Sequence, residues 1–161
     1  MSAKTKPVPE GYHTITPSLI VKSSRKAIDF YKRAFGAQER EVHEGPGGRV
    51  MHAEIKIGSS ILMLGDESPE RGCLSAASLK GSPANFYLYV ENADAVFNQA
   101  VKAGAQVKMP VADMFWGDRA GSVTDPFGFH WTIATHKEDP TPEQLKKGGE
   151  EFFAAMSQSK H

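Results

Sequence analysis

The sequence predicts an α+β domain made of two tandem βαβββ modules, which form a cupped mixed sheet with helices on the outside. Two observations support this fold. The segments Lys32–Gln38 and Ala100–Gln106 resemble each other at a spacing of 68 residues (32 to 100), and both end in Gly-Ala-Gln. Two predicted hairpin turns carry Gly58 and Gly128, 70 residues apart (58 to 128). A repeat of this kind indicates one supersecondary unit used twice.

The first module is predicted over residues 13–66, after a flexible arm at 1–12. A β-branched, apolar run at 15–21 predicts a strand, which Pro17 confines to a sheet edge or to the beginning of the strand. Apolar residues at helical spacing then predict a helix, capped by Ser23 or Ser24 and ended by Gly36. Period-two patterning and turn signals predict the remaining strands at 38–44, 51–57 and 61–64.

The second module is predicted over residues 84–136 and repeats the same order after a Gly-, Ser- and Pro-rich linker loop at 67–83. Its helix is predicted to begin after Asn92 and to end at Gly104. Strands are predicted at 85–90, 106–111, 120–124 and 129–135. We expect Asp125 to organise its own turn through bonds from side chain to backbone. In the tail, 137–161, a capping box at 141–144 predicts a final helix.

Composition excludes several classes of function. The 161 residues contain 19 Lys and Arg against 19 Asp and Glu, so neither a basic nucleic-acid surface nor an acidic tail is predicted. No apolar run approaches the roughly 20 residues that a membrane helix needs. The single cysteine, Cys73, cannot form an intramolecular disulfide. The first residues lack the pattern of a signal peptide, so we expect a cytoplasmic protein.

Strand patterning places the candidate site on the sheet faces that point away from the helices. Alternation in these strands predicts one apolar side and one side with polar and aromatic groups, which suits a small-molecule pocket. In the loop at 116–119, a tryptophan can stack on a planar ligand and an arginine can pair with a ligand carboxylate. The predicted ligand-binding residues are His52, Glu54, Asn85, Tyr87, Tyr89, Trp116, Arg119, His130 and Thr132. No residue is assigned a catalytic role.

Several segments resemble the vicinal oxygen chelate superfamily, which contains glyoxalases, bleomycin-resistance proteins and dioxygenases. Ser24–Gly36 resembles its first helix, and Asp125–Phe129 resembles the Asp-Pro-x-Gly turn before its last strand. Segments 52–55, 62–67 and 114–118 resemble the PhnB-like branch. The resemblance covers about residues 14–136 and implies the fold described above.

The resemblance also implies where a metal would bind, because metal-using members take His, Gln or Glu ligands from the first and last strands of each module. These positions fall on Thr16, Met63 (or Leu62 in the other register), Asn85 and Thr132. Such side chains are poor ligands for Zn, Ni or Fe. We therefore expect no metal at this position and no cofactor.

The sequence leaves three functions open. The first is a binding protein for a small, aromatic or antibiotic-like molecule. The second is a metal-dependent lyase, isomerase or dioxygenase that uses a displaced site around His52, Glu54 and His130. The third is a protein-interaction module. Because relatives commonly build the cup across a two-fold axis, we also expect a homodimer, with Phe152 and Phe153 of the last helix offering apolar surface.

Overall fold

The computed structural model describes residues 5–158 and contains two four-stranded sheets of the same topology. In each sheet, the first and fourth strands are parallel neighbours, and the remaining pairs are antiparallel. The predicted α+β fold of two βαβββ modules is therefore confirmed. The first module consists of β1 (Ser18–Val21), α1 (Ser24–Phe35), β2 (Gln38–Glu44), β3 (Val50–Ile57) and β4 (Ser60–Asp66), in the sheet order β1-β4-β3-β2.

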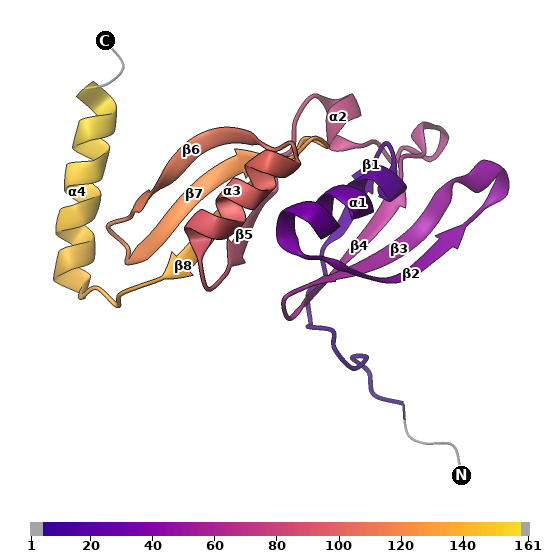
Figure 1. The fold of residues 1–161 in the computed structure, drawn as a ribbon, viewed down its shortest axis with the longest axis horizontal. Coiled ribbons are helices and arrows are strands. Elements are labelled where there is room, and N and C mark those ends of the chain that lie inside the picture. Colours follow the sequence, from indigo (N-terminus) through magenta and orange to yellow (C-terminus); the bar gives the residue numbers. More distant parts are fainter. Residues whose placement is uncertain (1–4, 159–161) are drawn as a thin grey trace.

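The second module repeats this arrangement with the sheet order β5-β8-β7-β6. It consists of β5 (Asn85–Tyr89), α3 (Ala93–Ala103), β6 (Gln106–Asp113), β7 (Asp118–Thr124) and β8 (His130–His136). The two sheets lie next to each other, and α1 and α3 cover them from the same side (Figure 1). The helices touch directly, because the Gln99 side chain donates to the Ala34 carbonyl and the Arg33 guanidinium donates to the Ala103 carbonyl.

Predicted capping residues lie at the ends of α1 and α3. The Ser23 hydroxyl accepts from the Lys26 amide, and Gly36 ends α1 with a φ of 66°. The Asn92 side chain accepts from the Ala95 amide at the start of α3. Pro17 lies directly before β1, which is an edge strand, so the strand begins three residues later than the apolar run suggests.

The segment predicted as a linker loop is more ordered than the sequence suggests. It contains a 3₁₀ turn, Pro69–Arg71, and a short helix, α2 (Ala76–Leu79). The Glu67 carboxylate accepts from both the Ser75 amide and the Ser78 hydroxyl, and these bonds lower the pKa of Glu67 to about 2. A four-residue helix is too short to leave an apolar period in the sequence, which is why the sequence does not predict α2.

The tail forms α4 (Pro142–Gln158), and its capping box is present with both bonds. The Thr141 hydroxyl accepts from the Gln144 amide, while the Gln144 side chain accepts from the Thr141 amide. Figure 1 shows α4 at the outer end of the second module, away from both helices. No helix within residues 5–158 is long and apolar enough to cross a membrane.

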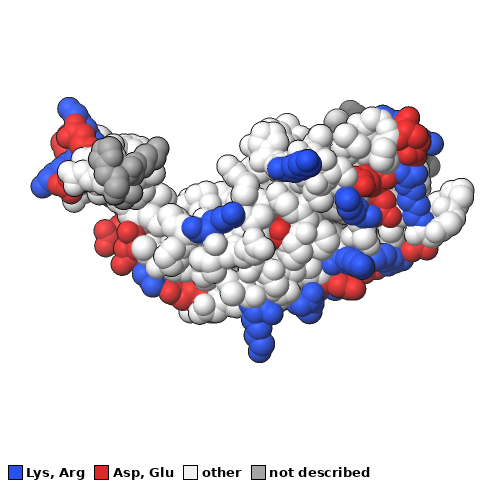
Figure 2. Space-filling model, turned by 90° about the horizontal axis from the view of Figure 1, so that it is seen from above, with Lys and Arg blue, Asp and Glu red and all other residues white. Residues whose placement is uncertain are grey.

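One hydrophobic core runs through both modules. The rings of Phe35 and Trp131 lie 4.7 Å apart, and Tyr31 donates a hydrogen bond of 2.6 Å to Asp125. Lysine, arginine, aspartate and glutamate are interspersed on the face seen from above, without a large area of one sign (Figure 2).

Candidate functional site

The second sheet presents a row of aromatic and polar side chains on the side away from α3. Phe86 and Leu88 pack toward the core, so alternation turns Tyr87 and Tyr89 outward, with 46% and 61% of their surface exposed. On the neighbouring strand, Thr132 lies directly opposite Tyr87. The rings of the two tyrosines are 5.0 Å apart and therefore form one continuous aromatic surface.

Asp118 is the centre of this surface, although it is only 3% exposed. Its Oδ2 accepts hydrogen bonds from the hydroxyls of Tyr87 (2.8 Å) and Tyr89 (3.0 Å) and from the indole N–H of Trp116 (3.2 Å). Its Oδ1 is 2.8 Å from Nδ1 of His136. A buried carboxylate is costly unless it is hydrogen-bonded, and here four donors satisfy one side chain. We refer to Asp118, Tyr87, Tyr89, Trp116 and His136 as the aromatic site.

The protonation states of the aromatic site follow from these bonds. Burial opposes ionisation of Asp118, but the bonds from His136, the two tyrosines and Trp116 outweigh burial and lower the pKa of the carboxyl group. Burial and the bond to Asp118 raise the pKa of Tyr87 to about 12. Bonds to Asp118 and Asp139 raise the pKa of His136. At neutral pH the tyrosines are therefore neutral donors to a carboxylate.

The last helix, α4, packs against the indole ring of Trp116. The ring centroid of Trp116 lies 6.5 Å from that of Phe152 on α4. The ring centroid of Phe115 lies 5.6 Å from that of the same phenylalanine. Gly148 permits the close approach, since a Cβ atom at that position would lie 2.6 Å from the Cβ of Phe115. Helix α4 therefore supports the aromatic site through the indole ring.

Arg119 does not belong to the aromatic site, in contrast to the sequence-based expectation. Its guanidinium forms two bonds to Asp94 on α3, of 2.6 and 2.7 Å, and one of 3.2 Å to Asp113. Alternation along β7 explains the difference, because Asp118 faces the aromatic surface and the next residue faces the helix. Both the charge and the donors of Arg119 are thus used within the protein.

Asn85 and His130 extend the same face of the second sheet and lie opposite each other on β5 and β8. Asn85 is exposed, and His130 is partly exposed, with its Nδ1 2.8 Å from the Thr124 hydroxyl. These groups supply hydrogen-bonding capacity beside the tyrosine rings.

His52 and Glu54 lie on the first sheet, with His52 Nε2 3.3 Å from Glu54 Oε1. His130 is not part of this pair, because it belongs to the other sheet. Instead, Glu41 on β2 brings its Oε1 to 3.7 Å from the same imidazole nitrogen. Among residues 5–158, these three side chains form the one group whose His and carboxylate ligand atoms all lie within 4.8 Å of one another.

The positions that would hold a metal in metal-using relatives are also divided between the sheets. Thr16 and Met63 belong to the first sheet region, where the Thr16 hydroxyl bonds the His13 carbonyl. Asn85 and Thr132 belong to the second sheet. A hydroxyl, a thioether and a neutral amide do not form a donor set for a transition metal, so these residues do not fit the group.

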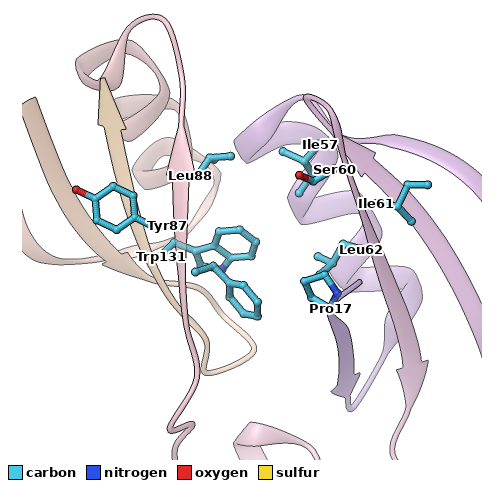
Figure 3. A pocket seen from close by; sticks show the side chains of 9 residues that line it. Pro17, Ile57, Ser60, Ile61, Leu62, Tyr87, Leu88 and Trp131 are labelled. Atoms are coloured by element: carbon cyan, nitrogen blue, oxygen red, sulfur yellow. The ribbon is translucent and has the colours of Figure 1, made fainter. Parts of the chain in front are cut away.

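An apolar pocket of about 160 Å³ lies at the seam between the modules (Figure 3). Its walls come from the segment before β1 and the β3–β4 hairpin on one side, and from β5 and β8 on the other: Pro17, Ile57, Ser60, Ile61, Leu62, Phe86, Tyr87, Leu88 and Trp131. In Figure 3 the Tyr87 hydroxyl points away from this seam. The volume is below the roughly 300–1,000 Å³ of ordinary ligand pockets, so this pocket alone suits at most a single small ring.

Sequence reasoning missed Asp118, His136 and Glu41 as site residues. Asp118 was expected in a loop, because the strand was predicted to begin at Ala120. The signal that could have identified Asp118 is its position two residues after Trp116, because side chains two residues apart in an extended segment point to the same side. Glu41 could be found only through the pairing of β2 with β3, which brings it directly opposite Glu54.

Comparison with known proteins gives consistent matches. The sequence model of the Glyoxalase/Bleomycin resistance protein/Dioxygenase superfamily matches residues 12–133. The protein Rv0887c of Mycobacterium tuberculosis is 40% identical over 135 residues, which cover 82% of this chain and 79% of that protein.

Solved structures show the same architecture. The Arabidopsis thaliana protein At5g48480 is 32% identical with a TM-score of 0.62, and the match covers 76% of this chain and 98% of that one. The PhnB protein of Bacillus cereus has a TM-score of 0.61 at 18% identity, covering 76% and 99%. At 18% identity, the similarity to the Bacillus cereus protein shows a shared fold alone.

Proposed function

Because the chain belongs to the Glyoxalase/Bleomycin resistance protein/Dioxygenase superfamily, we propose that it binds a small planar aromatic molecule at the aromatic site of its second sheet. The observation that carries this proposal is the bonding of two exposed tyrosines and one tryptophan to a single buried carboxylate, Asp118. A structural role alone would not require aromatic rings to remain exposed to solvent.

The network fixes the rings before a ligand arrives. Each phenol is restrained by its bond to Asp118, and Trp116 is restrained by both Asp118 and Phe152. Rings that are already ordered lose little conformational entropy on binding. Aromatic pairs contribute about 0.5–1.5 kcal/mol beyond the area that they bury, so a planar ligand gains most from this surface.

The polar surroundings favour a ligand with few charges. The carboxylate of Asp118 is satisfied by four donors, and the cation of Arg119 is paired with Asp94 and Asp113. Asn85, His130 and Thr132 remain beside the rings as hydrogen-bonding groups. We therefore expect an aromatic molecule with hydroxyl, amide or ring-nitrogen groups rather than a strongly anionic one.

A metal-dependent lyase, isomerase or dioxygenase is the weaker alternative for this surface. The residues at the usual ligand positions are Thr16, Met63, Asn85 and Thr132, and these do not fit a transition metal. His52 and Glu54 lie on the other sheet from the aromatic site and without His130. This donor chemistry favours binding over metal-assisted catalysis at the second sheet.

We further propose that the protein is a homodimer in which α4 contacts the second copy. The helix lies at the outer end of the second module (Figure 1), and Phe153 on it is 62% exposed. Light scattering should give twice the mass of the 17.5 kDa chain. A monomeric mass at micromolar concentration would remove the dimer while leaving the aromatic site intact.

The binding proposal is tested with 2-naphthol and its saturated analogue decahydro-2-naphthol as matched probes. Isothermal titration should detect binding of the planar compound and much weaker binding of the saturated one. Tyr87→Ala should weaken 2-naphthol binding about threefold to tenfold, the equivalent of one aromatic contact. Leu79→Ala removes an exposed apolar side chain on α2, outside the aromatic site, and should leave the affinity unchanged. Equal binding of both probes would count against the proposal.

A further inference from the structure

The first sheet carries a second arrangement that the aromatic site does not use. We propose that Glu41, His52 and Glu54 form a binding site for a divalent transition-metal ion, with Zn²⁺ as the expected occupant. This site is separate from the aromatic site, and neither proposal depends on the other.

The pairing of two strands places all three ligands on one face. Glu41 lies directly opposite Glu54 in the β2–β3 ladder, and His43 lies directly opposite His52. Because side chains two residues apart on a strand point the same way, the two glutamates and the two histidines lie together on one face of the sheet. The opposite face of these strands packs on α1, as the burial of Ala53 and Ile55 shows.

The separations of the ligand atoms match those around a bound zinc ion. His52 Nε2 lies 3.3 Å from Glu54 Oε1 and 3.7 Å from Glu41 Oε1. With metal–ligand distances of about 2.0–2.2 Å, tetrahedral geometry places its ligand atoms about 3.3–3.6 Å apart. Because all three ligand atoms lie within 4.8 Å of one another, side-chain movements without a change of backbone would let them hold one ion.

Glu54 uses its two oxygens for different purposes. Oε1 faces the imidazole, whereas Oε2 accepts a hydrogen bond of 2.5 Å from the Tyr12 hydroxyl and lies 3.7 Å from Nε of Arg40. Oε1 can therefore bind a metal while Tyr12 and Arg40 orient the carboxylate from behind, as partners of metal ligands commonly do. The residue is only 4% exposed, so it is a positioned group rather than a mobile surface acid.

The opposed carboxylates of Glu41 and Glu54 favour the binding of a cation. Two carboxylates stand directly opposite each other, which is unfavourable in a sheet unless a positive charge compensates for it. Arg40 supplies one cation to Glu54, and Lys32 and Arg25 pair with other acids, Glu39 and Glu44. A divalent ion between Glu41 and Glu54 would balance the pair.

The donor set selects the class of metal. One imidazole nitrogen and two carboxylate oxygens suit Zn²⁺ or a neighbouring first-row ion better than the all-oxygen preference of Mg²⁺ or Ca²⁺. His43 is not one of the three converging side chains, because its Nε2 lies 3.4 Å from the other oxygen of Glu41. The remaining position would be open to water or to a small oxygen ligand, as in zinc sites with three protein ligands.

The experiment uses the untagged full chain, loaded with ZnCl₂ and desalted, and measures bound metal by inductively coupled plasma mass spectrometry. Zn²⁺ affinity is then measured by titration for the unmodified chain and for each variant. We expect about one zinc per chain. His52→Ala and Glu54→Gln should each lower the affinity at least about tenfold. Since Glu54 is buried, His52→Ala is the decisive variant should Glu54→Gln fail to fold.

Glu44→Gln is the matched control, because Glu44 lies on β2 like Glu41 and pairs with Arg25 at 2.7 Å instead of with the proposed ligands. This variant should bind zinc as tightly as the unmodified chain. Retention of less than about a tenth of an equivalent by the unmodified chain would overturn the proposal, and so would unchanged affinity in His52→Ala. Neither result would affect the binding of 2-naphthol at the second sheet.

Discussion

The Tyr31 hydroxyl on α1 donates a hydrogen bond of 2.6 Å to Asp125, 94 residues later in the chain, and so connects the two modules. The other carboxylate oxygen of Asp125 accepts from the amides of Phe127 and Phe129 and organises the turn before β8. The indole of Trp131 completes the group. A single buried carboxylate thus holds both the turn and the contact between modules.

Tyr31→Phe should destabilise the protein by about 1–3 kcal/mol, because Asp125 would remain buried with one donor fewer. Urea unfolding at neutral pH gives this free energy. Tyr89→Phe also removes a hydroxyl that bonds an aspartate, but from an exposed ring, and should have a smaller effect. An unchanged midpoint for Tyr31→Phe would show that the bond is not needed to join the modules.

Sequence reasoning predicts the local features well and the long-range ones poorly. The repeat follows from the similarity of two segments, the caps at Ser23 and Asn92 from residue type, and the outward direction of Tyr87 from a period of two residues. The role of Asp125 in its turn was predicted, but its bond to Tyr31 was not, since nothing local links residues 94 apart. Asp118 was missed because a strand boundary was placed two residues too late.

Two adjacent glycines in α4 should respond oppositely to alanine. A Cβ atom at Gly148 would lie 2.6 Å from Phe115, whereas one at Gly149 would lie at an ordinary 3.5 Å. Gly149→Ala should stabilise the helix by up to about 1 kcal/mol through propensity. Gly148→Ala should lose more than this through the clash with Phe115. Hydrogen exchange across α4 measures both effects, and equal protection in the two variants would argue against the packing described.

The pair His136–Asp118 should make stability depend on pH. Bonds to Asp118 and Asp139 raise the folded pKa of His136 above its usual value near 6.5. The resulting stabilisation is fully present below pH 6.5 and is lost as pH rises through the raised pKa. Nuclear magnetic resonance titration should show His136 titrating above 6.5, with Asp139→Asn lowering the midpoint. A midpoint at or below 6.5 in the unmodified protein would contradict this.

Arg119→Ala should separate stability from binding. The side chain is partly exposed and pairs with Asp94 and Asp113, so its loss should cost no more than about 1 kcal/mol. Because the guanidinium faces α3, the affinity for 2-naphthol should not change. A clear loss of affinity without loss of stability would return Arg119 to the binding surface.

The most direct test of the aromatic site uses the two tryptophans as internal reporters. The indole N–H of Trp116 bonds Asp118 at the proposed site, and that of Trp131 bonds Asp125 in the core beside the seam pocket. Nitrogen-15 spectra during titration with 2-naphthol resolve the two signals. We predict that the Trp116 signal moves in a saturable way while the Trp131 signal stays in place. Movement of the Trp131 signal alone would place the ligand in the seam and contradict the account.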